Sequence, residues 1–283
     1  MAELSTLVGD IYHLLDEDTN HEPSEENVEW AGEQLKALLR SRLGARERRA
    51  SVLRFSSLGK PNRQLWYAQH RPELAERMLP KTYMKFLYGD VIEILLLFLA
   101  KEAGHEVTHL QEEVNVDGVK GHIDAIVDGT VVDVKSASPH GFKKFAEGTL
   151  EHNDDFGYIQ QISGYANVLA PDKGAAFLAA DKVHGDIALT QVSEEIVREH
   201  PPEQRIARLR EVLDREVPPR RCYPDEPDGK SGNRKLGTKC GYCPWKFECW
   251  KDANDGEGLK VYSYYNGPRF FTHIERKPRV AEF

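Results

Sequence analysis

The stretch GHIDAIVDGTVVDVKSAS, residues 121–138, contains two short apolar runs on either side of Asp128-Gly129. Asp-Gly between alternating runs predicts a β-hairpin, because a two-residue type I′ turn requires positive φ at both central positions. With these two residues in the turn, the predicted opposite pairs are Val127–Thr130, Ala125–Val132, Asp124–Asp133 and His122–Lys135. The sequence therefore predicts two carboxylates that face each other across a hairpin.

The two faces of this hairpin differ in character, because side chains alternate between the faces of a strand. One face is predicted to carry Ile123, Ala125, Val127, Val132 and Val134. The other is predicted to carry His122, Asp124, Asp133 and Lys135. Like charges directly opposite each other, with Cβ atoms about 5 Å apart, are destabilising, and a cation bound between them would reverse that sign. The alternative is a solvated polar face on an edge hairpin, and this stretch alone leaves both interpretations open.

The composition sets limits on the class of protein. A chain of 283 residues that is 40% hydrophobic can bury a sizeable core, as one large domain or a domain with appendages. Its longest apolar run, residues 91–100, is half of the roughly 20 residues that span a membrane, and the start lacks the basic region of a signal peptide. We therefore expect an intracellular, cytoplasmic protein with no membrane partner and no disulfides. The net charge of −8 argues against a protein that coats DNA non-specifically, but it permits a nucleic-acid enzyme with a local groove.

The order of predicted elements indicates an α/β fold with a mixed sheet. The patterns predict helices over 5–16, 24–43, 83–103, 155–170 and 194–214, and strands near 106–115, 119–127, 130–136, 174–180 and 186–192. The helix at 83–103 is apolar nearly all round, so we expect it to be buried. A basic run at 40–49 is either a solvated helix end or a DNA contact.

Glu93 is the one carboxylate in VIEILLLFLA, residues 91–100. An unpaired carboxylate in a buried helix costs several kcal/mol unless it is paired or coordinated. It is therefore either a helix-edge residue paired with an arginine or a third carboxylate beside Asp124 and Asp133. Carboxylate ligands of this kind suit Mg²⁺ or Mn²⁺.

Gln161 and Tyr165 are four residues apart, so they share one face of the predicted helix over 155–170. The plainer interpretation is a core stripe of Tyr158, Ile162 and Tyr165, with the glutamine incidental.

The four cysteines of the chain are Cys222, Cys240, Cys243 and Cys249, and the last three are spaced C-x2-C-x5-C. A C-x2-C step lets two thiolates bind one metal from a tight turn. The competing sites are zinc on four thiolates and a [4Fe–4S] cluster, against four unrelated reduced thiols.

Together these residues resemble the RecB-like branch of the PD-(D/E)xK nuclease superfamily. The matching motifs are Gly89-x-x-x-Glu93, Gly121-His-Ile-Asp124, Asp133-Val-Lys135 and Gln161-x-x-x-Tyr165. The cysteine spacing is similar to the members that carry an iron–sulfur cluster, including phage and CRISPR-associated exonucleases. The first cluster cysteine of that branch lies in a Cys-Pro-Arg-like box upstream of the nuclease motifs. The comparable stretch here, FSSLGKPNRQLWY at 55–67, has no cysteine, and Cys222 is expected to replace it.

The resemblance implies a restriction-endonuclease-like core with a mixed central sheet flanked by helices. The expected division is a helical N-terminal extension over 1–50, a nuclease core over 51–215, a four-cysteine segment over 216–252 and a tail over 253–283 that packs on the core. The implied function is a metal-dependent exonuclease that acts on DNA ends in recombination, repair or replication, in a phage or a prokaryote. The alternatives are an endonuclease on the same scaffold, a non-catalytic DNA-end-binding or assembly module, and a nuclease that works with a CRISPR integrase.

The resemblance also implies a role for each site residue. Glu93, Asp124, Asp133 and the Val134 carbonyl would hold one or two Mg²⁺ or Mn²⁺ ions, while Lys135, Gln161 and Tyr165 would position water and phosphate. His122 is either an extra ligand or a structural histidine. Lys143 and Lys144 either contact the DNA backbone or form a solvated helix start. Cleavage polarity, strand preference and oligomeric state do not follow from the sequence.

Overall fold

The computed structural model describes residues 2–44 and 53–283. The chain divides into two compact units, which we call unit 1 (residues 1–59 and 78–207) and unit 2 (residues 60–77 and 208–283). The four-segment division predicted from the sequence stays a prediction. The end of the predicted basic run, residues 45–49, lies outside the described residues.

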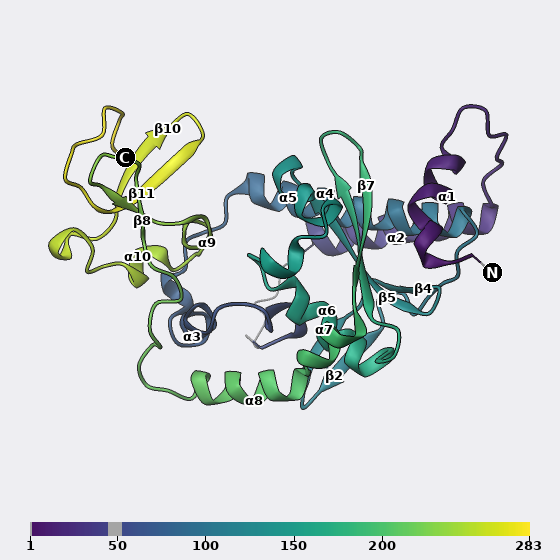
Figure 1. The fold of residues 1–283 in the computed structure, drawn as a ribbon, viewed down its shortest axis with the longest axis horizontal. Helices are drawn as coiled ribbons and strands as arrows, with labels where there is room; N and C mark the ends of the chain where they lie inside the picture. Colours follow the sequence, from purple (N-terminus) through teal and green to yellow (C-terminus); the bar gives the residue numbers. More distant parts are fainter. Residues whose placement is uncertain (1, 45–52) are drawn as a thin grey trace. The chain divides into compact units, whose positions relative to one another are not determined.

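Unit 1 is built on a five-stranded sheet in the order β1-β4-β5-β6-β7 (Figure 1). The strands are β1 (Val107–Thr108), β4 (Ala125–Val127), β5 (Thr130–Ala137), β6 (Ala175–Asp181) and β7 (Ile187–Val192). β5 pairs parallel to β6, while the β1–β4, β4–β5 and β6–β7 pairs are antiparallel. A separate antiparallel hairpin consists of β2 (Glu113–Val116) and β3 (Val119–His122). The predicted α/β fold with a mixed sheet is confirmed.

Helices cover both faces of this sheet. The helices of unit 1, together with α8, which ends in unit 2, are α1 (Leu7–Leu14), α2 (Glu25–Leu43), α4 (Pro80–Glu102), α5 (Pro139–Ala146), α6 (Tyr158–Leu169), α7 (Glu194–Glu199) and α8 (Pro202–Leu213), with 3₁₀ turns at Leu4–Thr6, Phe55–Ser57 and Leu150–His152. α1 and α4 bury Ile11 and Leu97 against one face, in a cluster that includes Val132 of β5. On the other face, the ring of Phe145 in α5 meets Phe177 of β6 at 5.7 Å.

The predicted hairpin forms, with φ of 50° at Asp128 and 80° at Gly129. Val127 pairs with Thr130 and Ala125 with Val132, so the predicted register is confirmed that far. The ladder then ends, because β3 leaves this sheet and pairs with β2. His122 lies opposite Glu113, so the predicted pairing with Lys135 is wrong. β5 has neighbours on both sides, so the edge-hairpin alternative is also wrong.

Two helix predictions differ from the structure. α4 is buried only near its C-terminal end, at residues such as Leu97 and Ala100, whereas Phe86 is 46% and Tyr88 50% exposed. Only the C-terminal part of α4 belongs to the core cluster that covers the sheet, so the earlier turns keep their apolar side chains accessible. The helix predicted over 194–214 is two helices, because Pro201 disfavours the helical conformation at the residue before it.

Unit 2 holds short elements and a small sheet in the order β10-β11-β9-β8. Its elements are α3 (Asn62–His70), β8 (Glu226–Pro227), β9 (Arg234–Lys235), α9 (Thr238–Gly241), α10 (Lys246–Cys249), β10 (Lys260–Tyr264) and β11 (Gly267–His273), with 3₁₀ turns at Pro72–Leu74 and Asn254–Gly256. α8 runs across the division between the units. Of the helices in the described part of the chain, none is long and apolar enough to cross a membrane.

Candidate functional site

Asp133 lies near the middle of β5 and is 4% exposed. The flanking residues Val132 and Val134 point into the apolar core on one face, so Asp133 points toward the other face, where α6 lies. Its Oδ2 atom is buried and forms an ion pair with the Lys135 ammonium, but no group in the described residues donates a well-directed hydrogen bond to it. Asp133 is thus a buried carboxylate with unused acceptor capacity.

Asp124 lies next to β4, just beyond the end of the β4–β5 ladder. Because the ladder ends at Ala125, the Asp124 side chain takes the place of a main-chain acceptor, and its Oδ2 accepts a hydrogen bond of 2.7 Å from the Val134 amide. Burial, and then the negative charges of Asp133 and Glu93, raise the pKa of Asp124 well above its ordinary value. Asp124 and Asp133 are therefore not a pair of the β4–β5 ladder as predicted, and Asp124 instead reaches β5 through its bond to the Val134 amide.

Glu93 joins these two carboxylates from α4. Its Oε1 accepts a hydrogen bond of 2.7 Å from the Gln111 side chain, and it forms no ion pair with an arginine of the described residues. Burial, followed by the charges of Asp133 and Asp90, raises the pKa of Glu93 to about 7. Nothing in the sequence around Gln111 indicated this contact, because it joins a loop to a helix.

Lys135 lies two residues after Asp133 and therefore on the same face of β5. Burial lowers the pKa of its ammonium, but Asp133 and Asp124 outweigh this effect and raise it above the ordinary value. The Nζ atom also lies 5.1 Å from the ring centre of Tyr158. We call Glu93, Asp124, Asp133 and Lys135 the carboxylate site, in which one cation faces three carboxylates.

Tyr165 of α6 lies beside this site. Its ring stacks on Phe55 with centroids 4.7 Å apart, a contact that the sequence did not indicate. Burial raises the pKa of Tyr165, and the negative charges of Asp133 and Asp124 raise it further. A hydrogen bond with the Gln161 side chain lowers this pKa, but by less. A Cβ atom at Gly121 would lie 2.5 Å from both Phe55 Cβ and Tyr165 Oη, which explains the need for glycine there.

The donor set suits a divalent metal such as Mg²⁺ or Mn²⁺. Three carboxylates share a partly desolvated site with a single lysine. Burial, and then mutual repulsion, raise the pKa values of Glu93 and Asp124, and a bound cation would offset both effects. Within the described residues, the group with three ligand atoms all within 4.8 Å is Asp181, His184 and Asp186, in the turn after β6. Asp181 is already bonded there to turn amides and to His184 Nδ1, at 2.9 Å.

The remaining predicted residues make contacts of their own. His122 is exposed and lies 3.9 Å from Glu113. Lys143 is exposed, while Lys144 donates to the Asn153 carbonyl at 2.9 Å and to Asp155 at 2.6 Å. Both lysines lie in the last turn of α5 rather than at a helix start.

The cysteine site consists of Cys222, Cys240, Cys243 and Cys249, all in unit 2 and all free thiols. The sulfurs lie near enough to affect one another. Burial and the other three cysteines raise the pKa of Cys240 to about 12, and burial is the largest cause that raises the pKa of Cys243 to about 11. With these pKa values the thiols of Cys240 and Cys243 stay protonated at neutral pH, and a bound metal would take the place of their protons.

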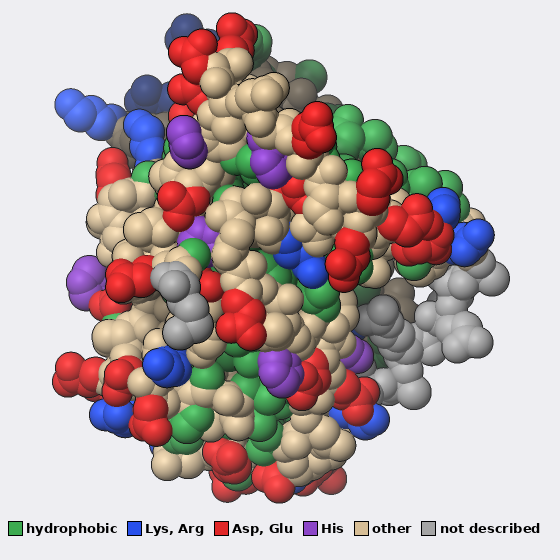
Figure 2. Space-filling model, turned by 90° about the vertical axis from the view of Figure 1, so that its right-hand side faces the viewer, with side chains coloured by type: hydrophobic (Ala, Val, Ile, Leu, Met, Phe, Trp, Pro, Cys, Tyr) green, Lys and Arg blue, Asp and Glu red, His purple; other side chains and the backbone are tan. Residues whose placement is uncertain are grey.

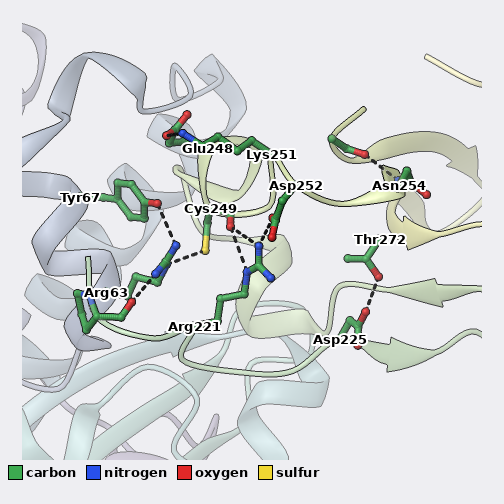
Figure 3. A network of polar contacts seen from close by, with 12 residues as sticks. Arg63, Tyr67, Arg221, Asp225, Glu248, Cys249, Lys251, Asp252, Asn254 and Thr272 are labelled. Carbon is green, nitrogen blue, oxygen red and sulfur yellow. Dashed lines mark hydrogen bonds and ion pairs between the residues drawn. The ribbon is translucent and has the colours of Figure 1, made fainter. Parts of the chain in front are cut away.

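Every sulfur of the cysteine site accepts a hydrogen bond from nitrogen. Cys222 accepts from the main-chain amides of Arg63 and Gln64, Cys240 from the Trp250 indole, and Cys243 from the Trp245 amide. Arg63 Nε donates to Cys249 Sγ at 3.2 Å (Figure 3). N–H donors around thiolates are typical of the outer shell of a metal site.

The surface gives a broader view of charge. Figure 2 shows the face that carries α1, where Asp and Glu side chains are spread over the described residues with Lys and Arg side chains among them. This face, as far as the structure describes it, therefore offers a polyanion no continuous basic surface.

Comparison with known proteins places the chain in a family. A solved structure described as "Crystal structure of SSO0001" is 20% identical, with a TM-score of 0.43, over 76% of this chain and 93% of that chain. Among curated proteins, none matches significantly. A family model described as the PD-(D/E)XK nuclease superfamily matches residues 2–250. The match covers most of the chain, so this protein belongs to the PD-(D/E)XK nuclease superfamily.

Proposed function

We propose that this protein is a Mg²⁺- or Mn²⁺-dependent exonuclease of the RecB-like branch that hydrolyses phosphodiester bonds at DNA ends. Membership of the superfamily implies a metal-dependent nuclease with DNA as its substrate. The observation that carries the proposal for this site is the convergence of Glu93, Asp124 and Asp133 on a partly buried lysine. Such a group is costly to fold without a cation, so its presence in one site favours a catalytic role.

Glu93, Asp124, Asp133 and the Val134 carbonyl are the groups that would hold the metal. A divalent ion bound there supplies an acidified water and neutralises charge on the phosphate. Asp124 is oriented by the Val134 amide and Glu93 by Gln111, so both carboxylates are held in place before metal binds. The unused acceptor capacity of Asp133 Oδ2 is directed into the same site.

Lys135 would orient the attacking water and stabilise the negative charge that develops on the phosphoryl oxygens. Its elevated pKa keeps the ammonium charged at neutral pH, which favours electrostatic stabilisation over proton abstraction. Gln161 and Tyr165 would hold the phosphate from α6. The raised pKa of Tyr165 keeps its hydroxyl a hydrogen-bond donor.

The exonuclease assignment rests on the RecB-like motifs, and in particular on Gln161-x-x-x-Tyr165. A role in recombination, repair or replication, in a phage or a prokaryote, follows from the same resemblance, as does a recombination, replication or CRISPR integrase partner. An endonuclease on this scaffold and a non-catalytic DNA-end-binding module are the alternatives that the experiment below separates.

We assign a structural [4Fe–4S] cluster to the cysteine site, with zinc as the alternative. The C-x2-C-x5-C spacing supports a cluster, because it is similar to the spacing in the family members that carry one.

The test uses end-labelled single- and double-stranded linear DNA beside covalently closed circles, each with Mn²⁺, Mg²⁺ or EDTA. The Lys135→Ala variant is compared with Lys173→Ala, which removes an exposed lysine. We expect metal-dependent loss of linear DNA alone, lost in Lys135→Ala and kept in Lys173→Ala. Cutting of circles would make the protein an endonuclease, and DNA binding without cleavage would favour the non-catalytic module.

A further inference from the structure

Arg63, in the first turn of α3, has a guanidinium that is directed at three acceptors. Its Nε donates to Cys249 Sγ at 3.2 Å. One terminal nitrogen donates to the Tyr67 hydroxyl at 3.1 Å, and the other donates to the Pro219 carbonyl. These acceptors come from α3 itself, from the loop before Cys222 and from the end of α10 (Figure 3). The guanidinium is therefore held in one orientation.

The charge of Arg63 lacks a carboxylate partner. Among the described residues, no aspartate or glutamate forms an ion pair with it, although its side chain is half-buried. A half-buried cation requires an anion nearby to offset its desolvation. A neutral thiol is only a weak acceptor, whereas four thiolates on zinc or on an iron–sulfur cluster form a group of net negative charge.

The main chain of Arg63 also contacts the cysteine site, at Cys222. Its amide and that of Gln64 donate to Cys222 Sγ. These are free amides at the start of α3, which has nine residues, and they have no acceptor within the helix. One residue thus donates to both Cys222 and Cys249, the first and last cysteines of the set.

We propose that Arg63 is a positioning residue for the sulfur-bound metal group of unit 2. Its guanidinium provides the counter-charge at Cys249, and the start of α3 binds Cys222 in a segment that itself lacks a cysteine. This inference rests on the cysteine part of the proposed function and is independent of the carboxylate site.

Arg221 provides a matched control. Its guanidinium lies on the opposite side of Cys249 in Figure 3 and donates to the Cys249 carbonyl at 2.9 and 3.1 Å, not to the sulfur. It also stacks on Trp250 at 4.0 Å and pairs with Asp252. Removal of either arginine changes the charge beside Cys249 equally, but only Arg63 contacts the sulfur.

The experiment compares full-length wild type, Arg63→Gln, Arg63→Lys and Arg221→Gln, all purified without oxygen. Iron, acid-labile sulfide and zinc are measured per chain, followed by the rate of metal loss to a chelator and, for a cluster, the midpoint potential. We expect Arg63→Gln to lose the group at least about tenfold faster and to show a lower potential, because a positive charge and an N–H···S bond are lost. Arg63→Lys should recover part of the effect, and Arg221→Gln should match wild type.

Retention and potential equal to wild type in Arg63→Gln would overturn the proposal, as would equal effects of Arg63→Gln and Arg221→Gln. Near-ultraviolet circular dichroism of the metal-loaded variants shows that each one is folded when compared. Wild-type protein that binds neither iron nor zinc would remove the cysteine part of the proposed function, and this inference with it. DNA cleavage by the same preparation reports separately on the carboxylate site.

Discussion

The carboxylate site and the cysteine site use opposite means to bring their ligands together. Asp133 and Lys135 lie on a strand with neighbours on both sides, and Glu93 lies on a helix whose later turns are buried against that sheet. The cysteines lie on loops and one-turn helices such as α9 and α10. Packing therefore positions the hard oxygen ligands of unit 1, whereas the soft ligands of unit 2 rely on individual hydrogen bonds, some of them from residues far away in the chain.

The apolar cores of the units differ accordingly. Unit 1 has a continuous cluster that joins α1, α4 and three strands. Unit 2 has two small clusters, one around Trp66, Tyr67 and Trp245 and one around Leu236, Trp250 and Ala253, and Cys249 packs against both. We infer that a metal in unit 1 serves chemistry, while a metal in unit 2 holds the fold.

The largest expected effect concerns chemistry alone. Asp133→Asn should reduce cleavage by at least about 1,000-fold, because it removes a ligand and charge from the metal site. The fold of unit 1 should persist, since the change is isosteric and relieves repulsion with Glu93 and Asp124. Cleavage rates and circular dichroism test this, with the exposed Asp172→Asn as control. An unfolded Asp133→Asn would mean that the site is structural, and the contrast between the units would fail.

Cys249→Ser should destabilise the fold of unit 2, whereas Asp133→Asn should leave the fold of unit 1 intact. Loss of one ligand and of the metal group should lower the free energy of unfolding of unit 2 by several kcal/mol. Three of the four tryptophans, Trp66, Trp245 and Trp250, lie in unit 2, so urea unfolding followed by fluorescence reports mainly on that unit. Far-ultraviolet circular dichroism should show unit 1 unfolding later. If the fluorescence and circular dichroism unfolding curves of Cys249→Ser coincide and equal those of wild type, the metal has no structural role.

The pH dependence of metal-free protein tests the carboxylate site more finely. Glu93 has a pKa of about 7 in the folded state against an ordinary value of 4.5, so the folded state binds the extra proton between these values. Stability should therefore fall as pH rises from about 4.5 to 7, by on the order of 3 kcal/mol.

Urea unfolding in EDTA at a series of pH values measures this fall. Glu93→Gln should reduce it, and Mn²⁺ should reverse it in wild type only. A flat profile in metal-free wild type would show that Glu93 is not desolvated beside Asp133.

The smallest effect concerns a contact of unit 1 that no metal supports. His105 is buried, and its nitrogens lie 2.6 Å from Asp128 and 3.2 Å from Asp10, so it joins α1 to the hairpin turn. His105→Gln should cost about 1–3 kcal/mol, because it leaves buried polar atoms imperfectly paired. Thermal unfolding measures the loss, and the metal-dependent cleavage rate should stay at the wild-type value below the melting temperature. A selective loss of cleavage in a stable variant would show that the turn and the site are coupled.

Local patterns in the sequence were sufficient for the hairpin register near Asp128-Gly129 and for an α/β fold with a mixed sheet. These depend on turn conformation and on periodicity, which act over a few residues. The end of the ladder at Ala125, the exposure of Phe86 and the partners of Glu93 did not follow from such patterns. Each depends on which distant segment arrives at that point, and no local pattern encodes this.

The same distinction applies to the two sites. Residue types and spacing determined which side chains have the chemistry to hold hard or soft metals, because carboxylate and thiolate donors differ whatever surrounds them. Only the tertiary structure decided that Gln111 orients Glu93, that Phe55 and Tyr165 require Gly121, and that Arg63 reaches Cys249. These contacts join residues far apart in the chain, and folding around separate cores brings them within bonding distance.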